Sequence, residues 1–343
     1  MSHVTLIGID LAKSVFQLCG LNKARKVQFN KKVSRAKFID AVRQHPNAVL
    51  VMEACGGAHH WARVFTEMGF KVRLVPAQHV KAFSRGNKTD ATDALAIAET
   101  AFRPDLFDVQ HKTLEQQDVQ TLLRIRSRIK GLRRDNANQV RGLLAEYGLV
   151  MPKQIRNLER YLPDILEDAE NALSPIARQA IYELYLEHQS LCQKTQALDQ
   201  QLAALIKQYP IANALTSIKG IGPVTALALY ASIGKGTQFK NARQLAAWLG
   251  LVPQQTGTGG HVRLGPISKR GDTYLRMLLI HGARVVMRWA NKLDDPLSHW
   301  ALQLAERRGK HKAIVGIANK TARMVWVVLH KGPSALPSHY RTV

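Results

Sequence analysis

The sequence predicts a mixed α/β fold for the N-terminal third of the chain and a mostly helical fold for the remainder. Short segments rich in β-branched and aromatic residues, which are typical of strands, occur between residues 4 and 76. Beyond residue 113, apolar residues recur at helical spacing over long stretches instead. A chain of 343 residues is also long enough for two or three domains, each with its own core.

Strand and helix patterns alternate in a definite order in the N-terminal part. They predict strands over 4–9, 15–21, 26–30, 47–53 and 71–76, and helices over 34–45, 57–70 and 90–102. The resulting order, βββαβαβα, is that of the ribonuclease-H-like fold, and actin-like ATP-dependent kinases begin in the same way. We expect a domain of this kind over residues 1–110.

The central part of the chain, residues 111–210, carries two long amphipathic segments. They lie at 119–148 and 177–208 and predict long helices, which could form a coiled-coil pair. Residues 211–343 then predict a separate, mostly helical C-terminal domain with a Gly-rich loop at 256–265.

A turn near the start of this C-terminal domain has the spacing of a helix-hairpin-helix motif. In LTSIKGIGPVTAL, Gly220 and Gly222 would let backbone amides at a helix N-terminus contact a phosphate. The alternative is a tight turn between helices, with Pro223 at the first helical position.

The chain is strongly basic. Lys and Arg total 49 against 25 Asp and Glu, so the formal net charge is +24 and the mean field attracts polyanions such as nucleic acid. The first long helical segment concentrates these cations, and the candidates for nucleic-acid contact are Arg124, Arg128, Lys130, Arg133 and Arg134. A solvated basic helix face is the alternative.

Cysteine usage and hydropathy argue for a cytoplasmic protein. Cys19, Cys55 and Cys192 are odd in number, lie far apart and lack CxxC spacing, so they indicate neither a disulfide framework nor a zinc site. The N-terminus lacks the order of a signal peptide, and no apolar run approaches the roughly 18 residues of a membrane span. We therefore expect no membrane partner.

Four acidic residues stand out against this basic background. Asp10 ends the first predicted strand, Glu53 ends the fourth, and Asp90 and Asp93 open the last helix of the N-terminal domain. If strands one and four are neighbours, these carboxylates converge, and they would repel unless divalent cations lie between them. Hard oxygen ligands suit Mg²⁺ or Mn²⁺, and two such ions can clamp a phosphodiester. The alternative is that Asp90 and Asp93 only favour the helix dipole.

The Gly-rich loop TGTGGHVRLG gives the C-terminal domain its own candidate site. Its glycines would allow a close backbone approach, with Thr258 and Arg263 within reach of a phosphate. Ser268, Lys269, Arg270 and Arg276 follow in the sequence, and the three cations could neutralise phosphates at or near the scissile bond. A plain turn between helices is the alternative.

These motifs resemble those of a known family. IGIDLAKSVFQ, VMEACGGAHHWA and NKTDATDALAIAE, followed by GLVPQQTGTGGHVRLGPISKRGDTYLRMLLIHGAR, are similar to the transposases of the insertion-sequence one-ten/eleven-eleven family. The resemblance extends from the first strand to nearly the last helix. It implies a RuvC-like DEDD domain with Asp10, Glu53, Asp90 and Asp93 as its carboxylates, a coiled-coil linker, and a C-terminal transposase domain that supplies a hydroxyl nucleophile.

The resemblance also implies partners and a reaction. Family members recombine donor and target DNA under the guidance of a structured bridge RNA, so we expect DNA, a guide RNA and a homo-oligomer, dimer or tetramer, associated with the bacterial nucleoid. The family usually has Ser directly before the GG of the loop, where this chain has Thr258; Ser268 is the second candidate nucleophile. A RuvC-like nuclease that uses water remains an alternative, as does the actin-like kinase.

Overall fold

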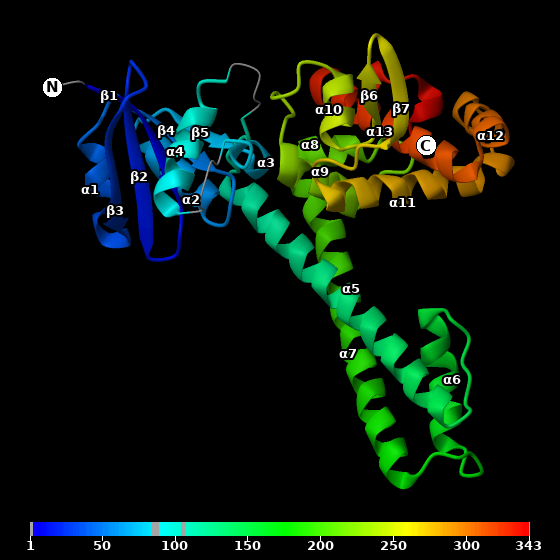
Figure 1. Cartoon of the computed structure of the whole chain (residues 1–343). Helices are drawn as coiled ribbons and strands as arrows, with labels where there is room; N and C mark the ends of the chain where they lie inside the picture. The colour runs from blue at the N-terminus through cyan, green and yellow to red at the C-terminus, as the bar shows by residue number, and fades with distance from the viewer. Residues whose placement is uncertain (1–2, 84–88, 104–107, 343) are drawn as a thin grey trace. The chain divides into compact units, whose positions relative to one another are not determined.

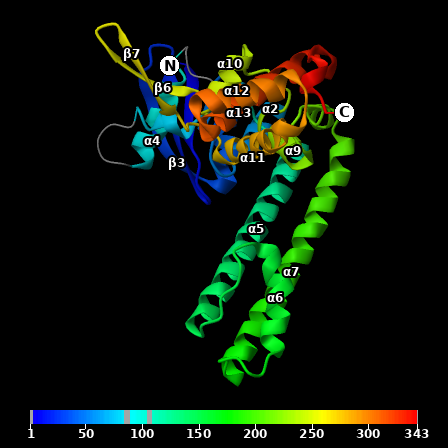
Figure 2. The ribbon, with the colours of Figure 1, turned by 90° about the vertical axis from the view of Figure 1, so that its right-hand side faces the viewer.

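The computed structural model describes residues 3–83, 89–103 and 108–342. The chain divides into two compact units, Met1–Leu114 and Glu115–Val343 (Figure 1, Figure 2). The first unit is α/β and the second is mostly helical, as the sequence predicts. None of the helices in the described ranges combines the length and the apolar character that a membrane span requires.

A mixed five-stranded sheet forms the centre of the described part of the first unit. Its order is β3-β2-β1-β4-β5, with β1, β2 and β3 antiparallel and with β4 and β5 parallel to β1. The first and fourth strands are neighbours, which is the condition for their strand-end carboxylates to lie close together. The strands are β1 (Val4–Asp10), β2 (Val15–Asn22), β3 (Val27–Ser34), β4 (Val49–Glu53) and β5 (Val72–Val75).

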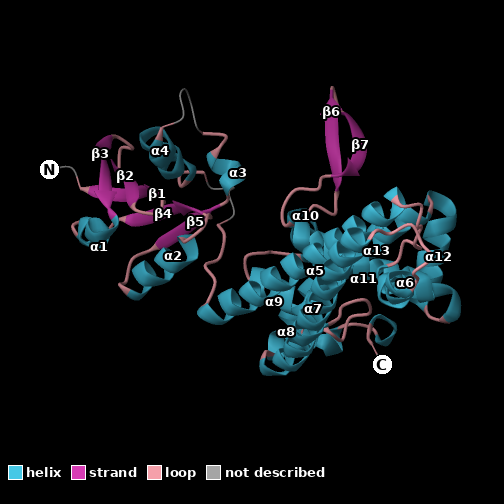
Figure 3. Ribbon diagram, turned by 90° about the horizontal axis from the view of Figure 1, so that it is seen from below, coloured by secondary structure: helices cyan, strands magenta, loops and turns pink. Residues whose placement is uncertain are grey.

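Helices cover both faces of this sheet (Figure 3). They are α1 (Phe38–Arg43), α2 (Ala58–Glu67), α3 (Ala77–Val80) and α4 (Asp90–Thr100). Ile7 and Leu50 pack with Trp61 in the core on the α1 and α2 side, whereas Leu6 and Val51 pack with α4 on the other side. Alternate residues of each strand therefore face different helices, as the strand geometry requires.

Three helices run side by side in the central part of the chain. They are α5 (Leu114–Glu146), α6 (Ile155–Glu167) and α7 (Pro175–Leu205). Figure 2 shows α6 beside α7, and the three share a core that includes Val140, Leu158 and Ile181. The two long helices confirm the prediction, while α6 was not expected from the sequence.

The rest of the second unit packs around a separate, larger core that includes Leu227, Leu279 and Val325. Its helices are α8 (Pro210–Leu215), α9 (Pro223–Ile233), α10 (Ala242–Trp248), α11 (Thr273–Trp289), α12 (Pro296–Arg308) and α13 (Lys310–Lys331). Between α10 and α11 an antiparallel hairpin, β6 (Pro253–Thr258) and β7 (His261–Ile267), extends beyond the helices in Figure 3.

This hairpin corrects the prediction of a flexible loop at 256–265. Thr258 pairs with His261, and Gly259 and Gly260 form the two-residue turn with φ of 57° and 82°. A two-residue hairpin turn with positive φ at both positions matches the twist of its strands, and glycine adopts it without strain. The same glycines that suggest flexibility in the sequence therefore specify a defined turn.

Candidate active site

Asp10 and Glu53 lie at neighbouring positions on parallel strands. Ile9 of β1 pairs with Met52 of β4, so the next residues along the two strands are Asp10 and Glu53. Every second residue of a strand faces the same side of the sheet. Leu6 and Val51 pack against α4, and Asp10 and Glu53 lie four and two residues after them, so both carboxylates lie on the α4 face. Each is partly buried. The predicted convergence of the two strand ends is thus present in the fold.

The charges of these two carboxylates both act on the thiol of Cys55. Cys55 follows β4 by two residues, and its backbone N–H donates to the carbonyl of Glu53 at 2.8 Å. Burial, and then the charges of Glu53 and Asp10, raise the pKa of the Cys55 thiol. The thiol is therefore kept protonated and neutral beside two carboxylates.

Close packing of α4 on β1 brings the helix to this edge of the sheet. A Cβ on Gly8 would lie 2.3 Å from the carbonyl oxygen of Ala94 and 2.7 Å from the Cβ of Ala98. Only glycine permits this approach. Asp93 directly precedes Ala94, and Gly8 lies two residues before Asp10 on the same face of β1.

The first turn of α4 is fixed by a capping box and by contacts to the sheet. The Thr89 side chain accepts from the N–H of Thr92, whose hydroxyl in turn accepts from the N–H of Thr89. Asp90 pairs with Lys32 of β3 at 3.2 Å, and Asn30 of β3 donates to the Ala91 carbonyl at 2.9 Å. Asp90 and Asp93 therefore lie in the first turn of α4, and Asp90 forms an ion pair with Lys32 of β3.

Gln17 is a polar residue of this edge that the sequence reasoning missed. It pairs with Asp10 across β1 and β2 and is only 5 % exposed, and its amide donates to Asn30 at 2.6 Å. Its side chain and that of Asn30 connect β2, β3 and the first turn of α4. A buried Gln in an otherwise apolar strand, opposite a strand-end Asp, is the signal in the sequence that could have identified it.

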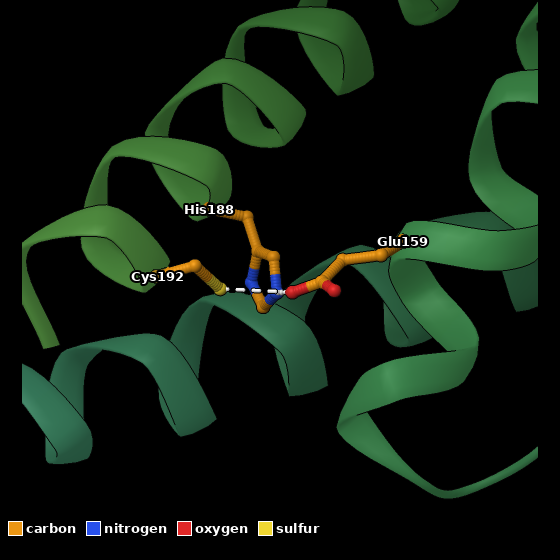
Figure 4. Close-up of side chains that lie close together, drawn as sticks. All are labelled: Glu159, His188 and Cys192. Atoms are coloured by element: carbon orange, nitrogen blue, oxygen red, sulfur yellow. Dashed lines mark hydrogen bonds and ion pairs between the residues drawn. The ribbon is translucent and has the colours of Figure 1, made fainter. Parts of the chain in front are cut away.

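The donor set at this edge fits a hard divalent cation, because all four predicted ligands are carboxylates. Their oxygens do not come within 4.8 Å of one another as a group of three or more; in the described part of the chain, that spacing is met by Glu159, His188 and Cys192 in the second unit (Figure 4).

In the second unit, Thr258 occupies the tip of the β6–β7 hairpin. It is exposed, as is Arg263 on β7. Ser268 is partly buried just beyond β7, and its N–H donates to the carbonyl of Val252 at 2.8 Å. The two candidate nucleophiles therefore differ in access, and the Thr258 hydroxyl is the more open.

Of the three cations that follow, Lys269 and Arg270 are exposed, whereas Arg276 is not. Arg276 is 8 % exposed, and its guanidinium donates to the carbonyls of Leu249 and Arg270 at 3.0 Å each and to the Thr273 hydroxyl at 3.2 Å. The prediction that Arg276 contacts phosphate is wrong. Its position on the apolar side of α11 turns the side chain inward, where it holds the loop backbone.

The Gly220 and Gly222 turn connects α8 to α9, with Gly222 as the N-cap and Pro223 in the first turn of α9. Gly220 has φ of 89°, and a Cβ there would lie 3.0 Å from the Gly282 carbonyl of α11. Gly220 therefore serves close helix packing. Space around Gly222 is open within 4 Å, so the N-terminus of α9 keeps room for an anion.

The predicted cations of α5 have mixed environments. Arg124, Arg128, Lys130 and Arg134 are exposed, and Arg133 is partly buried. Arg124 and Arg128 line a pocket shared with α9 and the start of α11. Desolvation, and then the charge of Arg126, lower the pKa of Lys130, so this helix face carries repulsion that a polyanion would relieve.

Comparisons with known proteins match most of the chain to transposases. A family model of DEDD transposases of the IS110 type matches residues 7–149, and the model described as the transposase IS116/IS110/IS902 family matches residues 212–297. The first match includes all four carboxylates, and the second includes the hairpin and the Gly220 turn.

Individual relatives extend this agreement to nearly full length. The transposase for insertion sequence element IS1111A of Coxiella burnetii is 43 % identical over 96 % of this chain and 90 % of its own length. A protein of Pseudomonas aeruginosa assigned to family 20 of the transposases is also 43 % identical, over 96 % and 98 %. The transposase for element IS1328 of Yersinia enterocolitica is 34 % identical, over 97 % and 98 %. The chain therefore belongs to the IS110 family of transposases, enzymes that bind, cut and rejoin DNA.

Proposed function

We propose that this transposase excises and inserts a mobile DNA element with a DEDD site in a ribonuclease-H-like (RuvC-like) first unit and a hydroxyl nucleophile in the second. The observation that carries the proposal is the adjacency of Asp10 and Glu53 on the sheet face covered by α4, whose first turn supplies Asp90 and Asp93. The order β3-β2-β1-β4-β5, with helices on both faces, supports the fold.

Asp10, Glu53, Asp90 and Asp93 would hold Mg²⁺ or Mn²⁺, which supplies charge neutralisation for the scissile phosphate. The chain's own contribution is positioning: the β1 and β4 register aligns two carboxylates, and the Thr89 capping box with the Lys32 ion pair fixes the helix that carries the other two. Rigid strands and a capped helix give the preorganisation that such a site needs.

For the nucleophile we propose Thr258, with Ser268 as the alternative. The hydroxyl loses its proton, its oxygen forms an ester bond to phosphorus, and the deoxyribose oxygen leaves. A hydroxyl of the recipient strand then attacks the same phosphorus and releases the Thr258 hydroxyl. The number of phosphate ester bonds is unchanged, so no external energy source is needed. The hairpin tip exposes Thr258 for this attack.

Seven exposed cations and the partly buried Arg133 are proposed to bind donor and target DNA and a structured guide RNA. The exposed cations are Arg124, Arg128, Lys130, Arg134, Arg263, Lys269 and Arg270. The N-terminal amides of α9 at Gly222 would add a phosphate contact. We also propose a homo-oligomer, dimer or tetramer, acting in the bacterial cytoplasm. The division into regions 1–110, 111–210 and 211–343 is supported by the separate cores around Val140 and Leu227 in the second unit.

A single plasmid assay that scores excision and joining of the element tests both halves of the site. Asp10→Asn keeps the size of the side chain but removes a carboxylate charge, and Thr258→Ala removes the hydroxyl. Each is expected to lower strand exchange by at least about 10²-fold, whereas Thr258→Ser and Ser268→Ala retain activity. Full activity of Asp10→Asn would refute the metal site, and full activity of Thr258→Ala would transfer the role to Ser268.

The same reactions also distinguish transposition through a covalent intermediate from hydrolysis. The samples are denatured, and protein that stays linked to labelled DNA is measured. A water-using RuvC-like nuclease leaves no adduct. RNA that copurifies with the protein can be sequenced from the same preparation, and a structured transcript of the element's own flank is the expected guide. Recovery of only bulk cellular RNA would count against guidance by RNA.

A further inference from the structure

Three side chains with metal-binding atoms, none of them a DEDD residue, meet between α6 and α7 of the second unit (Figure 4). Glu159 comes from α6, and His188 and Cys192 come from α7. The two α7 residues are four positions apart, which places them on one face of the helix. The ligand atoms of all three lie within 4.8 Å of one another.

The contacts within this group are short but leave its histidine unsatisfied. The Cys192 thiol donates to Oε1 of Glu159 at 2.9 Å, and Nε2 of His188 lies 3.5 Å from the same oxygen. His188 is 0 % exposed; within the described ranges its Nδ1 has no hydrogen-bond partner, and its Nε2 has only the ion-pair contact with Glu159. A buried polar group without a partner costs free energy and requires a ligand, ion or water to explain it.

We propose that Glu159, His188 and Cys192 form a binding site for a divalent transition-metal ion, with Zn²⁺ as the physiological candidate. An imidazole, a thiolate and a carboxylate are the nitrogen, sulfur and oxygen ligands that Zn²⁺ prefers, and a thiolate excludes Mg²⁺ and Ca²⁺ as preferred occupants. The site is distinct from the all-carboxylate DEDD set and requires no part in DNA chemistry.

The geometry needs only a small adjustment to accept the ion. Tetrahedral bonds of ordinary length place zinc ligands roughly 3.4 to 3.6 Å apart. The His188 to Glu159 separation of 3.5 Å already matches this value. The sulfur and the Glu159 oxygen, at 2.9 Å, must separate slightly as the ion replaces the thiol proton between them.

The surroundings allow an ion to enter and a fourth ligand to bind. The Glu159 side chain is 50 % exposed, and Glu159 and Cys192 line a groove that continues along α7 past Gln196. Nη1 of Arg133 on α5 donates to the Cys192 sulfur at 3.9 Å, so α5 also contacts this group of side chains. An occupied site would fasten α6 to α7 through bonds stronger than the contacts of Leu158 and Leu162 alone.

The test uses full-length protein stripped with a chelator and titrated with Co²⁺ alone, since cobalt reports its ligands by absorption. Wild type is expected to bind one Co²⁺ ion that gives a sulfur-to-cobalt charge-transfer band, whereas Co²⁺ bound by carboxylates alone gives no such band. Cys192→Ser should abolish the band while circular dichroism stays unchanged, and Glu159→Gln should weaken binding by about tenfold or more. Zn²⁺ should displace the Co²⁺ and raise the melting temperature of wild type but not of Cys192→Ser.

Matched controls separate this site from other thiols and carboxylates. Glu183→Gln changes an exposed carboxylate of α7 outside the cluster, and Cys19→Ala removes a buried thiol of the first unit. Both should keep the band and the affinity. The proposal is overturned if wild type shows no sulfur-to-cobalt band, or if the band survives in Cys192→Ser. Neither result depends on strand exchange, so the outcome is independent of the proposed DEDD mechanism.

Discussion

Individual residues in this chain have roles that their type alone does not determine. Arg276 and Arg270 are both cations near the hairpin, yet Arg276 is buried and bonded to backbone carbonyls while Arg270 is exposed. Asp295 is likewise a charged residue with a structural role. It caps α12 through the N–H groups of Leu297 and Ser298 and accepts from Lys219 at 3.1 Å. Burial and partners, rather than charge, separate the structural residues from the functional ones.

Asp295→Ala is expected to destabilise the protein in a pH-dependent way. Although burial of this side chain raises its pKa, hydrogen bonds from Ser298 and the ion pair with Lys219 outweigh that effect, so the pKa lies below its ordinary value. A depressed carboxyl pKa stabilises the fold above the unfolded value of about 3.9 and loses that effect as pH falls through the folded pKa.

The expected loss for Asp295→Ala at pH 7 is about 1–3 kcal/mol, since a cap and a partly buried ion pair disappear together. Melting temperatures of wild type and variant, measured from pH 7 down to pH 3, should converge at the acid end. The control is Asp294→Ala, whose side chain is 95 % exposed and should melt as wild type does. If the difference in melting temperature between wild type and Asp295→Ala grows toward low pH, the lowered pKa of Asp295 is contradicted.

Secondary-structure elements place the site through close backbone contacts. Asp10 and Glu53 lie on the sheet face covered by α4, and this helix, which carries Asp90 and Asp93 in its first turn, can lie directly on β1 because residue 8 is glycine. In the second unit the corresponding element is the β6–β7 hairpin, whose residues are almost entirely exposed and whose shape depends on the Gly259 and Gly260 turn. The position of α4 determines where Asp90 and Asp93 lie, and the hairpin turn determines where Thr258 lies.

Gly8→Ala is therefore expected to impair strand exchange beyond its effect on stability. The added Cβ would lie 2.3 Å from a backbone oxygen of α4, so the helix must shift and carry Asp90 and Asp93 with it. Overpacking of this kind costs about 1–3 kcal/mol. Thermal unfolding measures the loss of stability. The excision assay, run well below the melting temperature of the variant, measures the loss of strand exchange.

Gly131→Ala is the control for this substitution, because it lies within α5 with open space around it and should slightly stabilise the helix. Wild-type excision by a Gly8→Ala protein that is folded at the assay temperature would show that the position of α4 does not limit catalysis.

The whole molecule combines a strong positive charge with several independent cores. Its net charge is +24, and the exposed cations of α5 include Arg124 and Arg128, which are four residues apart on one helix face. Such a surface binds nucleic acid largely by releasing counterions, so affinity falls steeply with salt. The charge of the molecule thus accounts for affinity, while the arrangement of particular faces accounts for where the polyanion binds.

Arg124→Ala combined with Arg128→Ala should weaken binding of duplex DNA and flatten its salt dependence. Each lost phosphate contact lowers the slope of log K against log salt by about 0.9. Binding titrations with duplex DNA at several salt concentrations measure this slope. Lys23→Ala with Lys26→Ala removes the same charge from an exposed turn of the first unit. If both double variants flatten the slope equally, net charge, and not the α5 face, governs binding.

Much of this protein is determined locally and could be predicted from the sequence. Short runs of β-branched and aromatic residues identify β1 and β4, and helical spacing identifies α4, α5 and α7; β1 and β4 are neighbours in the sheet. Strand ends then locate Asp10 and Glu53, because parallel neighbours end at the same edge of a sheet. The motifs around the four carboxylates also predict the family that the comparisons establish.

Other features depend on contacts between residues far apart in the chain, and only the tertiary structure decided them. Arg276 points inward because the carbonyl of Leu249, 27 residues earlier in the chain, lies there together with that of Arg270. Glu159 meets His188 and Cys192 only after α6 packs on α7. Sequence periodicity records which face of an element is buried, but not which distant side chains that burial brings together.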